Sequence, residues 1–352
     1  MASDEAPGQA GLGAFGILGP LEVQRSGRAV PLGGPRQRAV LAVLLLQANR
    51  MVSVDRLVED VWQGHAPEAS VTSLQTYVFH LRRALEPGRP RGGGGEVLAT
   101  RDRGYLLHVS RERLDAAVFE DGLTAGLAAL AAGRHSEAAA RLGRALDLWR
   151  GPVLADLSDY AFIQAEAARL EELRLAAVEG RIEAELALGR HNAVTAELEQ
   201  LVAEHPLRER LHGQLMLALY RCGRQADALA AYRRVRDLLA DELGIDPGEP
   251  LRRLHASVLA HDPALDWDGG RPAAPEGRPA GGGTPAPRPP GLRRAAGRRE
   301  LDWVRRRGRR LLAVGSALAV VGAVCIVAVA RPWAGEPAGL PGNSVGLIDP
   351  SG

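Results

Sequence analysis

The chain has 352 residues, with 44 basic and 42 acidic side chains, and it contains no lysine. A Walker A phosphate loop and Schiff-base catalysis both need a lysine, so these two kinds of site are excluded. Cys222 lies in a helical region and Cys325 in a strongly apolar run, so no disulfide or cysteine-based metal site is expected. The first residues, MASDEAPGQAG, lack the basic and apolar regions of a secretory signal.

Residues 14–110 mix strand and helix signals. Short apolar runs broken by Gly-Pro and Ser-Gly predict a small β-meander over 15–32. Apolar residues at helical spacing then predict a series of helices, with Ser53 as a candidate N-cap and Pro87 as a stop, over 36–48, 53–62 and 70–86. A charged tip between apolar flanks predicts a β-hairpin over 96–109.

The third of these helices has two chemically different sides. Its apolar stripe, which should face a core, consists of Val71, Leu74, Val78, Leu81 and Leu85. The opposite side has no acid before Glu86 and carries groups that can hydrogen-bond bases or phosphates, namely Thr72, Ser73, Thr76, His80 and Arg83. Arg82 lies closer to the stripe, where a phosphate contact or a packing role is expected.

The hairpin that follows places Arg101 and Arg103 at its tip. A helix followed by a basic β-wing is the arrangement of a winged helix-turn-helix, in which the helix enters the major groove. The predicted DNA-binding residues are therefore Thr72, Ser73, Thr76, His80, Arg82, Arg83, Arg101 and Arg103. The alternative for the helix alone is a solvated polar face, which any amphipathic helix has.

Residues 112–262 are expected to be helical throughout. Gly189 and Gly223 are 34 residues apart, as are Ala196 and Ala230, and this is the period of tetratricopeptide repeats. The segment 169–186 is rich in acids that alternate with arginines, which favours surface pairs at i,i+4 spacing. The predicted fold is mainly α: a winged helix-turn-helix (α+β) followed by an all-α tetratricopeptide-like domain.

These segments resemble a known family. "LGPLEV", "RAVLAVLLLQANRMVSVDRLVEDVW", "SLQTYVFHLRRALEP" and "RGYLLHV" are similar to the OmpR-type winged helix of the Streptomyces antibiotic regulatory protein (SARP) family. "FEDGLTAGLAALAAGRHSEAAARLGRALDLWRGPVLADL", "EELRLAAVEGRIEAELALGRH" and the helical sequence after them resemble the bacterial transcriptional activation domain that accompanies this winged helix. The resemblance covers about residues 14–262 and implies an activator that binds direct-repeat promoter DNA. The partners that it implies are a second protomer and RNA polymerase.

The rest of the chain has a different composition. Residues 263–310 are rich in proline, glycine and arginine, which predicts a disordered linker. Residues 311–330 carry no charge and are long enough for one transmembrane helix. The arginines before this run predict that the N-terminal domains are cytoplasmic, which makes residues 331–352 a short extracytoplasmic tail.

The combined prediction is a DNA-binding transcriptional regulator, tethered to the cell membrane by a single span and acting as a homodimer. No catalytic constellation, cofactor motif or metal-ligand spacing is found among the residues, so neither an enzyme nor a cofactor is expected. The alternative is a membrane-anchored helical-repeat adaptor for other proteins, with a winged helix that does not read DNA.

Overall fold

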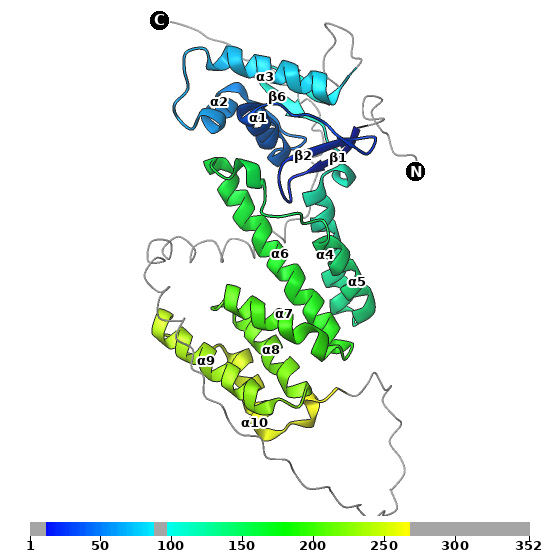
Figure 1. Ribbon diagram of the computed structural model, residues 1–352, viewed down its shortest axis with the longest axis vertical. Coiled ribbons are helices and arrows are strands. Elements are labelled where there is room, and N and C mark those ends of the chain that lie inside the picture. Colours follow the sequence, from blue (N-terminus) through cyan, green and yellow to red (C-terminus); the bar gives the residue numbers. More distant parts are fainter. Residues whose placement is uncertain (1–11, 88–96, 268–352) are drawn as a thin grey trace, which may run out of the picture. The chain divides into compact units, whose positions relative to one another are not determined.

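The computed structural model describes residues 12–87 and 97–267 (Figure 1). The chain begins there with a small antiparallel sheet in the order β1-β2-β3. Its strands are β1 (Leu12–Gly16), β2 (Glu22–Arg25) and β3 (Arg28–Ala29). This sheet confirms the predicted meander.

Three helices follow in the predicted places. The first is α1 (Pro35–Leu46). Every residue from Ala39 to Leu45 is buried, which agrees with a sequence that is apolar on all sides of the helix over this stretch. The second, α2 (Val54–Trp62), begins at Ser53, whose hydroxyl accepts a hydrogen bond from the backbone N–H of Arg56 at 3.2 Å. The third, α3 (Ser70–Leu85), packs against both α1 and α2.

A second sheet, in the order β4-β6-β5, lies beside these helices. The predicted hairpin forms its β5 (Leu98–Arg101) and β6 (Gly104–Leu107), joined at an exposed tip. Its third strand, β4 (Met51–Ser53), pairs with β6 and was not predicted. Gly104 has to be glycine, because a Cβ there would lie 2.2 Å from the carbonyl oxygen of Val52.

From residue 115 to residue 260 the structure is built from helices, as predicted. They are α4 (Asp115–Ala131), α5 (His135–Leu146), α6 (Ala161–Ala187), α7 (His191–Glu204), α8 (Glu209–Arg221), α9 (Gln225–Leu243) and α10 (Glu249–Ala260). Gly189 and Gly223 end α6 and α8 with φ of +81° and +74°, a left-handed conformation that favours glycine. The 34-residue spacing thus corresponds to two equivalent helix pairs.

Short 3-10 turns accompany these helices at Arg111–Arg113, Ala155–Leu157 and Pro263–Leu265. The last turn lies inside the predicted linker, so the folded part continues beyond residue 262. The reason is a tertiary contact: the indole N–H of Trp267 donates to the carbonyl of Ala187 at 3.0 Å. The ring also lies over Gly189, where a Cβ would come within 2.4 Å of it.

The buried apolar residues form two main clusters. One runs from the N-terminal sheet through α1, α2 and α3 into α4, α5 and α6, and includes Phe15, Leu41, Phe119 and Ile163. The other joins α6 to α7, α8, α9 and α10. Because the first cluster contains residues from both parts of the chain, the N-terminal elements and the first helices of the helical part share one core.

Polar contacts reinforce this shared core at Asp115. Its carboxylate accepts hydrogen bonds from the backbone N–H groups of Ile17 and Leu18, at 2.8 and 3.0 Å, and lies 3.3 Å from the guanidinium of Arg150. Burial raises the pKa of Asp115, whereas the two N–H groups and Arg150 act in the opposite direction. Arg150 also pairs with Glu22 of β2 at 2.9 Å, so one arginine bridges both parts of the chain.

One carboxylate of α6 departs from the predicted surface pairs. Glu179 is only 2% exposed. Its carboxylate accepts a hydrogen bond at 2.8 Å from the guanidinium of Arg208, the residue just before α8. The alternation of charges predicted Glu179 on the surface, because this pattern considers only pairs of residues on the same helix. The partner is 29 residues away and is brought close by the packing of α6 against α8.

Some predictions fall on residues that the structure does not describe. These are most of the linker, the candidate transmembrane run 311–330 and the tail 331–352. Among residues 12–87 and 97–267, no helix has the length and apolar character that crossing a membrane requires.

Candidate nucleic-acid interface

The inward side of α3 agrees with the predicted stripe except at its beginning. Leu74, Val78, Leu81 and Leu85 are buried, but Val71 is 43% exposed and the buried residue of the first turn is Ser70. A helix turns about 100° per residue, so Ser70 lies about 40° from Leu74 and Val71 about 60° on the other side. The prediction for Val71 is therefore wrong, because the core ends on the Ser70 side of the helix.

The outward side of α3 is a continuous polar and aromatic surface, here called the reading face. Its residues are exposed and follow helical i, i+3, i+4 spacing: Thr72, Gln75, Thr76, Phe79, His80 and Arg83. Ser73, which was also predicted to contact DNA, is half-buried at the edge of this face. No residue of α3 is acidic, so the reading face presents no carboxylate to a phosphate backbone.

The prediction had missed Gln75 and Phe79. Phe79 is 61% exposed, and its ring meets that of His80 edge-on at 5.5 Å between centroids. Exposure of an apolar phenylalanine ring to water is unfavourable, and such a ring can contact a thymine methyl group. A glutamine can form two hydrogen bonds with adenine. Both residues could have been found by extending the spacing of Thr72, Thr76 and His80 to every position on that side.

The hydroxyl of Thr76 is partly engaged within the helix. It donates to the carbonyl oxygen of Thr72 at 3.0 Å. Its lone pairs remain available, so this side chain acts as a hydrogen-bond acceptor toward a ligand on the reading face.

The wing brings the other predicted arginines together. Arg101 and Arg103 are exposed on either side of Asp102, at the end of the β5–β6 hairpin, and Asp102 itself has φ of +32°. Arg83, Arg101 and Arg103 are exposed, and within residues 12–87 and 97–267 no ion pair or hydrogen bond engages their side chains. Free guanidinium groups of this kind are available to phosphates or base edges.

Arg82 has a different environment from the other predicted residues. Its guanidinium donates to the carbonyl of Leu98 at 2.8 Å and to the hydroxyl of Thr100 at 2.7 Å. It also lies 5.8 Å from the centroid of the Tyr105 ring. Of the two roles expected for Arg82, these contacts correspond to packing: the residue ties α3 to the wing and fixes the position of one relative to the other.

Aromatic packing joins α3 to α2. Trp62, the last residue of α2, stacks on Tyr77 of α3 with centroids 6.1 Å apart. The guanidinium of Arg36 lies 5.7 Å from the centroid of the Trp62 ring. The helix α3 is therefore held in place by α1, α2 and the wing. Sequence-specific contacts require side chains that are preorganised in this way.

Metal chemistry finds no support near this surface. In the part of the chain that the structure describes, no three His, Cys, Asp or Glu side chains are grouped closely enough to hold a metal ion. The exposed side chains of the reading face and the wing can form hydrogen bonds, ion pairs and apolar contacts.

Two family models match the chain. The model described as "Transcriptional regulatory protein, C terminal" matches residues 27–107, and the one described as "Bacterial transcriptional activator domain" matches residues 114–259. The first match contains the reading face and the wing, and the second contains the helices from α4 to α10.

Several regulators are similar to this chain. The regulatory protein DnrI of Streptomyces peucetius is 39% identical over 256 residues, covering 72% of this chain and 94% of DnrI. The transcriptional regulatory protein EmbR of Mycobacterium tuberculosis is 46% identical over 253 residues, covering 71% of this chain but 64% of EmbR. The matched region therefore spans less than two thirds of EmbR.

A solved structure is also similar. It is that of Mycobacterium tuberculosis EmbR in complex with a low-affinity phosphopeptide, with a TM-score of 0.67 and 45% sequence identity. The likeness covers 72% of this chain and 66% of that chain.

Proposed function

The chain belongs to the SARP-type bacterial transcriptional regulators, which join the winged-helix domain of the first family model to a bacterial transcriptional activator domain. We propose that it activates transcription by sequence-specific binding to promoter DNA. The families and relatives that match are transcriptional regulators and not enzymes. The observation that carries the proposal is the acid-free reading face of α3 beside unpaired arginines on the wing.

In this proposal α3 enters the major groove and its reading face contacts base edges. Arg83 pairs with guanine and Gln75 with adenine, because these side chains match the hydrogen-bonding edges of those bases. Phe79 contacts a thymine methyl group. Thr72, Ser73, Thr76 and His80 make the remaining hydrogen bonds to bases or to the phosphates that flank the groove.

The wing contributes affinity without sequence preference. Arg101 and Arg103 contact phosphates, and each neutralised phosphate releases condensed counterions. Arg82 acts through its contacts with Leu98 and Thr100, which keep the wing at a fixed distance from α3. Loss of Arg82 is therefore expected to disturb both kinds of contact.

The remaining partners follow from the family. Binding to direct repeats by a homodimer, and recruitment of RNA polymerase through the helical part, are what the resemblance implies. Membership of the family and the shared core between the winged helix and the helices support these proposals. That core gives the helical part a fixed attachment to the DNA-binding part, so a partner held by one is positioned by the other.

The test is a binding experiment across a salt series. The full chain is titrated with the promoter region beside its own gene and with random duplex of equal length, with footprinting on the former. We expect preference for the promoter and a steep loss of affinity with salt, since phosphate contacts release counterions. The His80→Ala/Arg83→Ala double variant should lose the preference and the footprint.

The adaptor is the competing function. A winged helix that does not read DNA would show no preference over random duplex at any salt concentration. That result would overturn the proposal and turn attention to protein partners of the helical part.

We also propose attachment to the cell membrane, with the DNA-binding part in the cytoplasm. The support is the sequence alone: Leu311 to Ala330 is uncharged, and arginines precede it from Arg293 to Arg310. The chain should sediment with membranes and resist extraction by carbonate, and a variant lacking residues 311–330 should be found in the supernatant. Complete extraction of the intact chain by carbonate would refute the span.

A further inference from the structure

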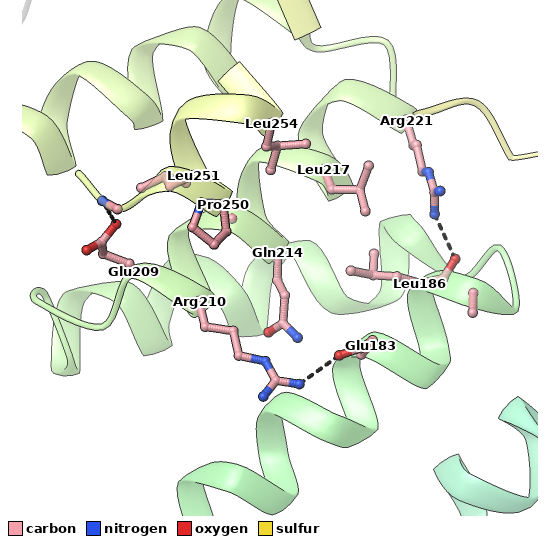
Figure 2. A pocket seen from close by; sticks show the side chains of 13 residues that line it. Glu183, Leu186, Glu209, Arg210, Gln214, Leu217, Arg221, Pro250, Leu251 and Leu254 are labelled. Carbon is pink, nitrogen blue, oxygen red and sulfur yellow. Dashed lines mark hydrogen bonds and ion pairs between the residues drawn. The ribbon is translucent and has the colours of Figure 1, made fainter. Parts of the chain in front are cut away.

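A groove of about 750 Å³ opens in the helical part, between the end of α6, α8 and the start of α10 (Figure 2). Its walls are mainly apolar, with Leu186, Leu217, Leu251 and Leu254 among the lining residues. Volumes of roughly 300–1,000 Å³ with apolar walls and few polar groups are typical of small-molecule sites. The groove therefore has the size and lining of a ligand site, and it lies on elements other than α3 and the wing.

Two polar side chains of α8 give the groove its chemical character. Gln214 and Arg221 both line it and are seven residues apart, so they lie on one side of the helix and about 10 Å apart along its axis. Leu217 lies between them on the same side. An elongated ligand lying along α8 could therefore reach both groups and cover the leucines between them.

Gln214 has an unused acceptor. The residue is 8% exposed, and its amide N–H donates to the carbonyl of Glu179 at 2.8 Å. Its carbonyl oxygen Oε1 is buried and has no hydrogen-bond partner among the described residues. A buried acceptor without a donor is costly. A ligand that donates an O–H or N–H to Oε1, which requires a small rotation of the amide toward the groove, gains a hydrogen bond that the protein itself leaves unmade.

Arg221 has a guanidinium without a carboxylate partner. It donates to the carbonyl oxygens of Leu265 at 2.7 Å and Leu186 at 3.1 Å, and within residues 12–87 and 97–267 it forms no ion pair. Burial lowers the pKa of Arg221. The negative charge of Asp266 acts in the opposite direction but does not outweigh burial. A ligand carboxylate would supply the charge that this half-buried cation lacks.

The other arginine of the groove is already neutralised. Arg210 pairs with Glu183 at 2.7 Å and lies 3.6 Å from Glu179. Glu209 adds a second negative charge to the groove and accepts from the backbone N–H of Gly248 at 2.7 Å. Two glutamates and two arginines line the groove, so their charges sum to zero, and Arg221 is the arginine among them that has no carboxylate of the described residues within pairing distance. The groove therefore suits a single carboxylate at Arg221 and disfavours a phosphate group or polyanion, which would need more positive charge.

We propose that this groove binds a small amphipathic carboxylic acid. The carboxylate pairs with Arg221, the aliphatic body lies on Leu217 and its neighbouring leucines, and a hydroxyl or amide at the far end donates to Oε1 of Gln214. The proposal concerns the helical part and does not depend on the DNA-binding function.

The probe for the test is 8-hydroxyoctanoate, whose hydroxyl and carboxylate are separated by an aliphatic chain that matches the spacing along α8. Its binding to the full chain is measured by saturation-transfer NMR, beside octanoate, which lacks the hydroxyl, and 1,8-octanediol, which lacks the carboxylate. We expect the hydroxy acid to bind best. Removal of either polar end should weaken binding by about tenfold, because a hydrogen bond or ion pair to a buried group is lost.

A matched pair of variants locates the binding. A Cβ at Gly213 would lie 3.7 Å from Leu251 and 3.8 Å from Leu254, which is ordinary contact, so Gly213→Ala should leave the groove open. Gly213→Leu extends farther and should abolish binding by filling it. Both changes favour helix over glycine, so both variants should fold, as thermal melting followed by circular dichroism can verify.

A third variant tests the charge. Arg221→Gln keeps N–H donors for the backbone carbonyls but removes the cation, and it should make the acid bind no better than the diol. Equal binding by wild type and Gly213→Leu would overturn the proposal. So would equal affinity for the acid and the diol in the wild type, or the absence of saturation transfer from all three probes.

Discussion

Arg83 and Arg103 are exposed arginines with different expected contacts. Arg83→Ala should weaken binding to the preferred site by about 1–3 kcal/mol and leave binding to random duplex nearly unchanged, because it removes a base contact. Arg103→Ala should weaken both alike and reduce the slope of log K against log salt by about one, because it removes a phosphate contact. Titrations of both duplexes across a salt series measure these changes.

The control for this pair is Arg253→Ala. Arg253 is also a well-exposed arginine, with 76% of its side chain accessible, but it lies on α10 in the helical part. It should leave both affinities unchanged. Equal losses on specific and random duplex for Arg83→Ala would mean that Arg83 contacts only phosphate.

Phe79 offers a prediction in which stability and DNA binding separate. Because its ring is 61% exposed, Phe79→Ala should barely change the urea midpoint, yet it should weaken specific binding by removing an apolar base contact. Leu81→Ala, at a fully buried position of the same helix, should instead lower stability by about 2–5 kcal/mol. If Phe79→Ala bound its site like the wild type, the ring would have no part in recognition.

At single positions, sequence reasoning located the outward side of α3 but not the end of its buried stripe, since Val71 is exposed. The side of α3 that carries Thr72, Thr76 and His80 follows from 3.6-residue periodicity alone. The sequence could limit Arg82 only to two roles, because its acceptors Leu98 and Thr100 lie 16 and 18 residues further along the chain. Their distance from Arg82 depends on how the wing packs on α3.

The start of α2 depends on one hydroxyl. Ser53 accepts from the N–H of Arg56, so Ser53→Ala should lower the free energy of unfolding by about 1 kcal/mol. Ser53→Asp keeps an acceptor at the cap and should retain most of the stability. Urea denaturation of both variants measures the difference, and equal losses would assign the effect to the pairing of Ser53 with Gly104 instead.

Histidines in the later helices make stability depend on pH. Burial lowers the pKa of His191, His212 and His255 below the ordinary value of 6.5. The folded chain holds these rings neutral, while the unfolded chain takes up protons below pH 6.5. Their contribution to stability is therefore present above that pH and is lost as pH falls through the folded-state pKa values.

The measurement is the urea midpoint at about pH 7.5 and about pH 5.5, where the lower pH should give the lower midpoint. His212 lies on α8 and its ring contacts the carbonyl of Pro206 at 2.9 Å. His212→Gln retains a donor for that carbonyl but cannot titrate, so it should reduce the difference between the two midpoints. An unchanged difference would show that His212 does not contribute to the pH dependence.

The joint between the two parts of the chain centres on Asp115. Asp115→Asn replaces one acceptor oxygen by a donor that faces N–H groups and Arg150, so stability should fall by about 2–3 kcal/mol. Asp121→Asn removes an acid from the same helix whose pair with Arg111 is exposed, and should cost about 0–1 kcal/mol. Comparable losses in urea denaturation would show that the joint adds nothing beyond an exposed ion pair.

From the amino-acid sequence alone we could predict the helices, the hairpin with its arginine tip, the 34-residue spacing of Gly189 and Gly223, and the family. Each of these depends on residues close together in the chain, where periodicity, caps and turn residues act. The folded chain was needed to show that β4 pairs with β6, that Glu179 is buried against Arg208, and that an apolar groove opens beside Arg221. These features join segments distant in sequence, and no local pattern encodes which distant partner a strand, carboxylate or helix face will meet.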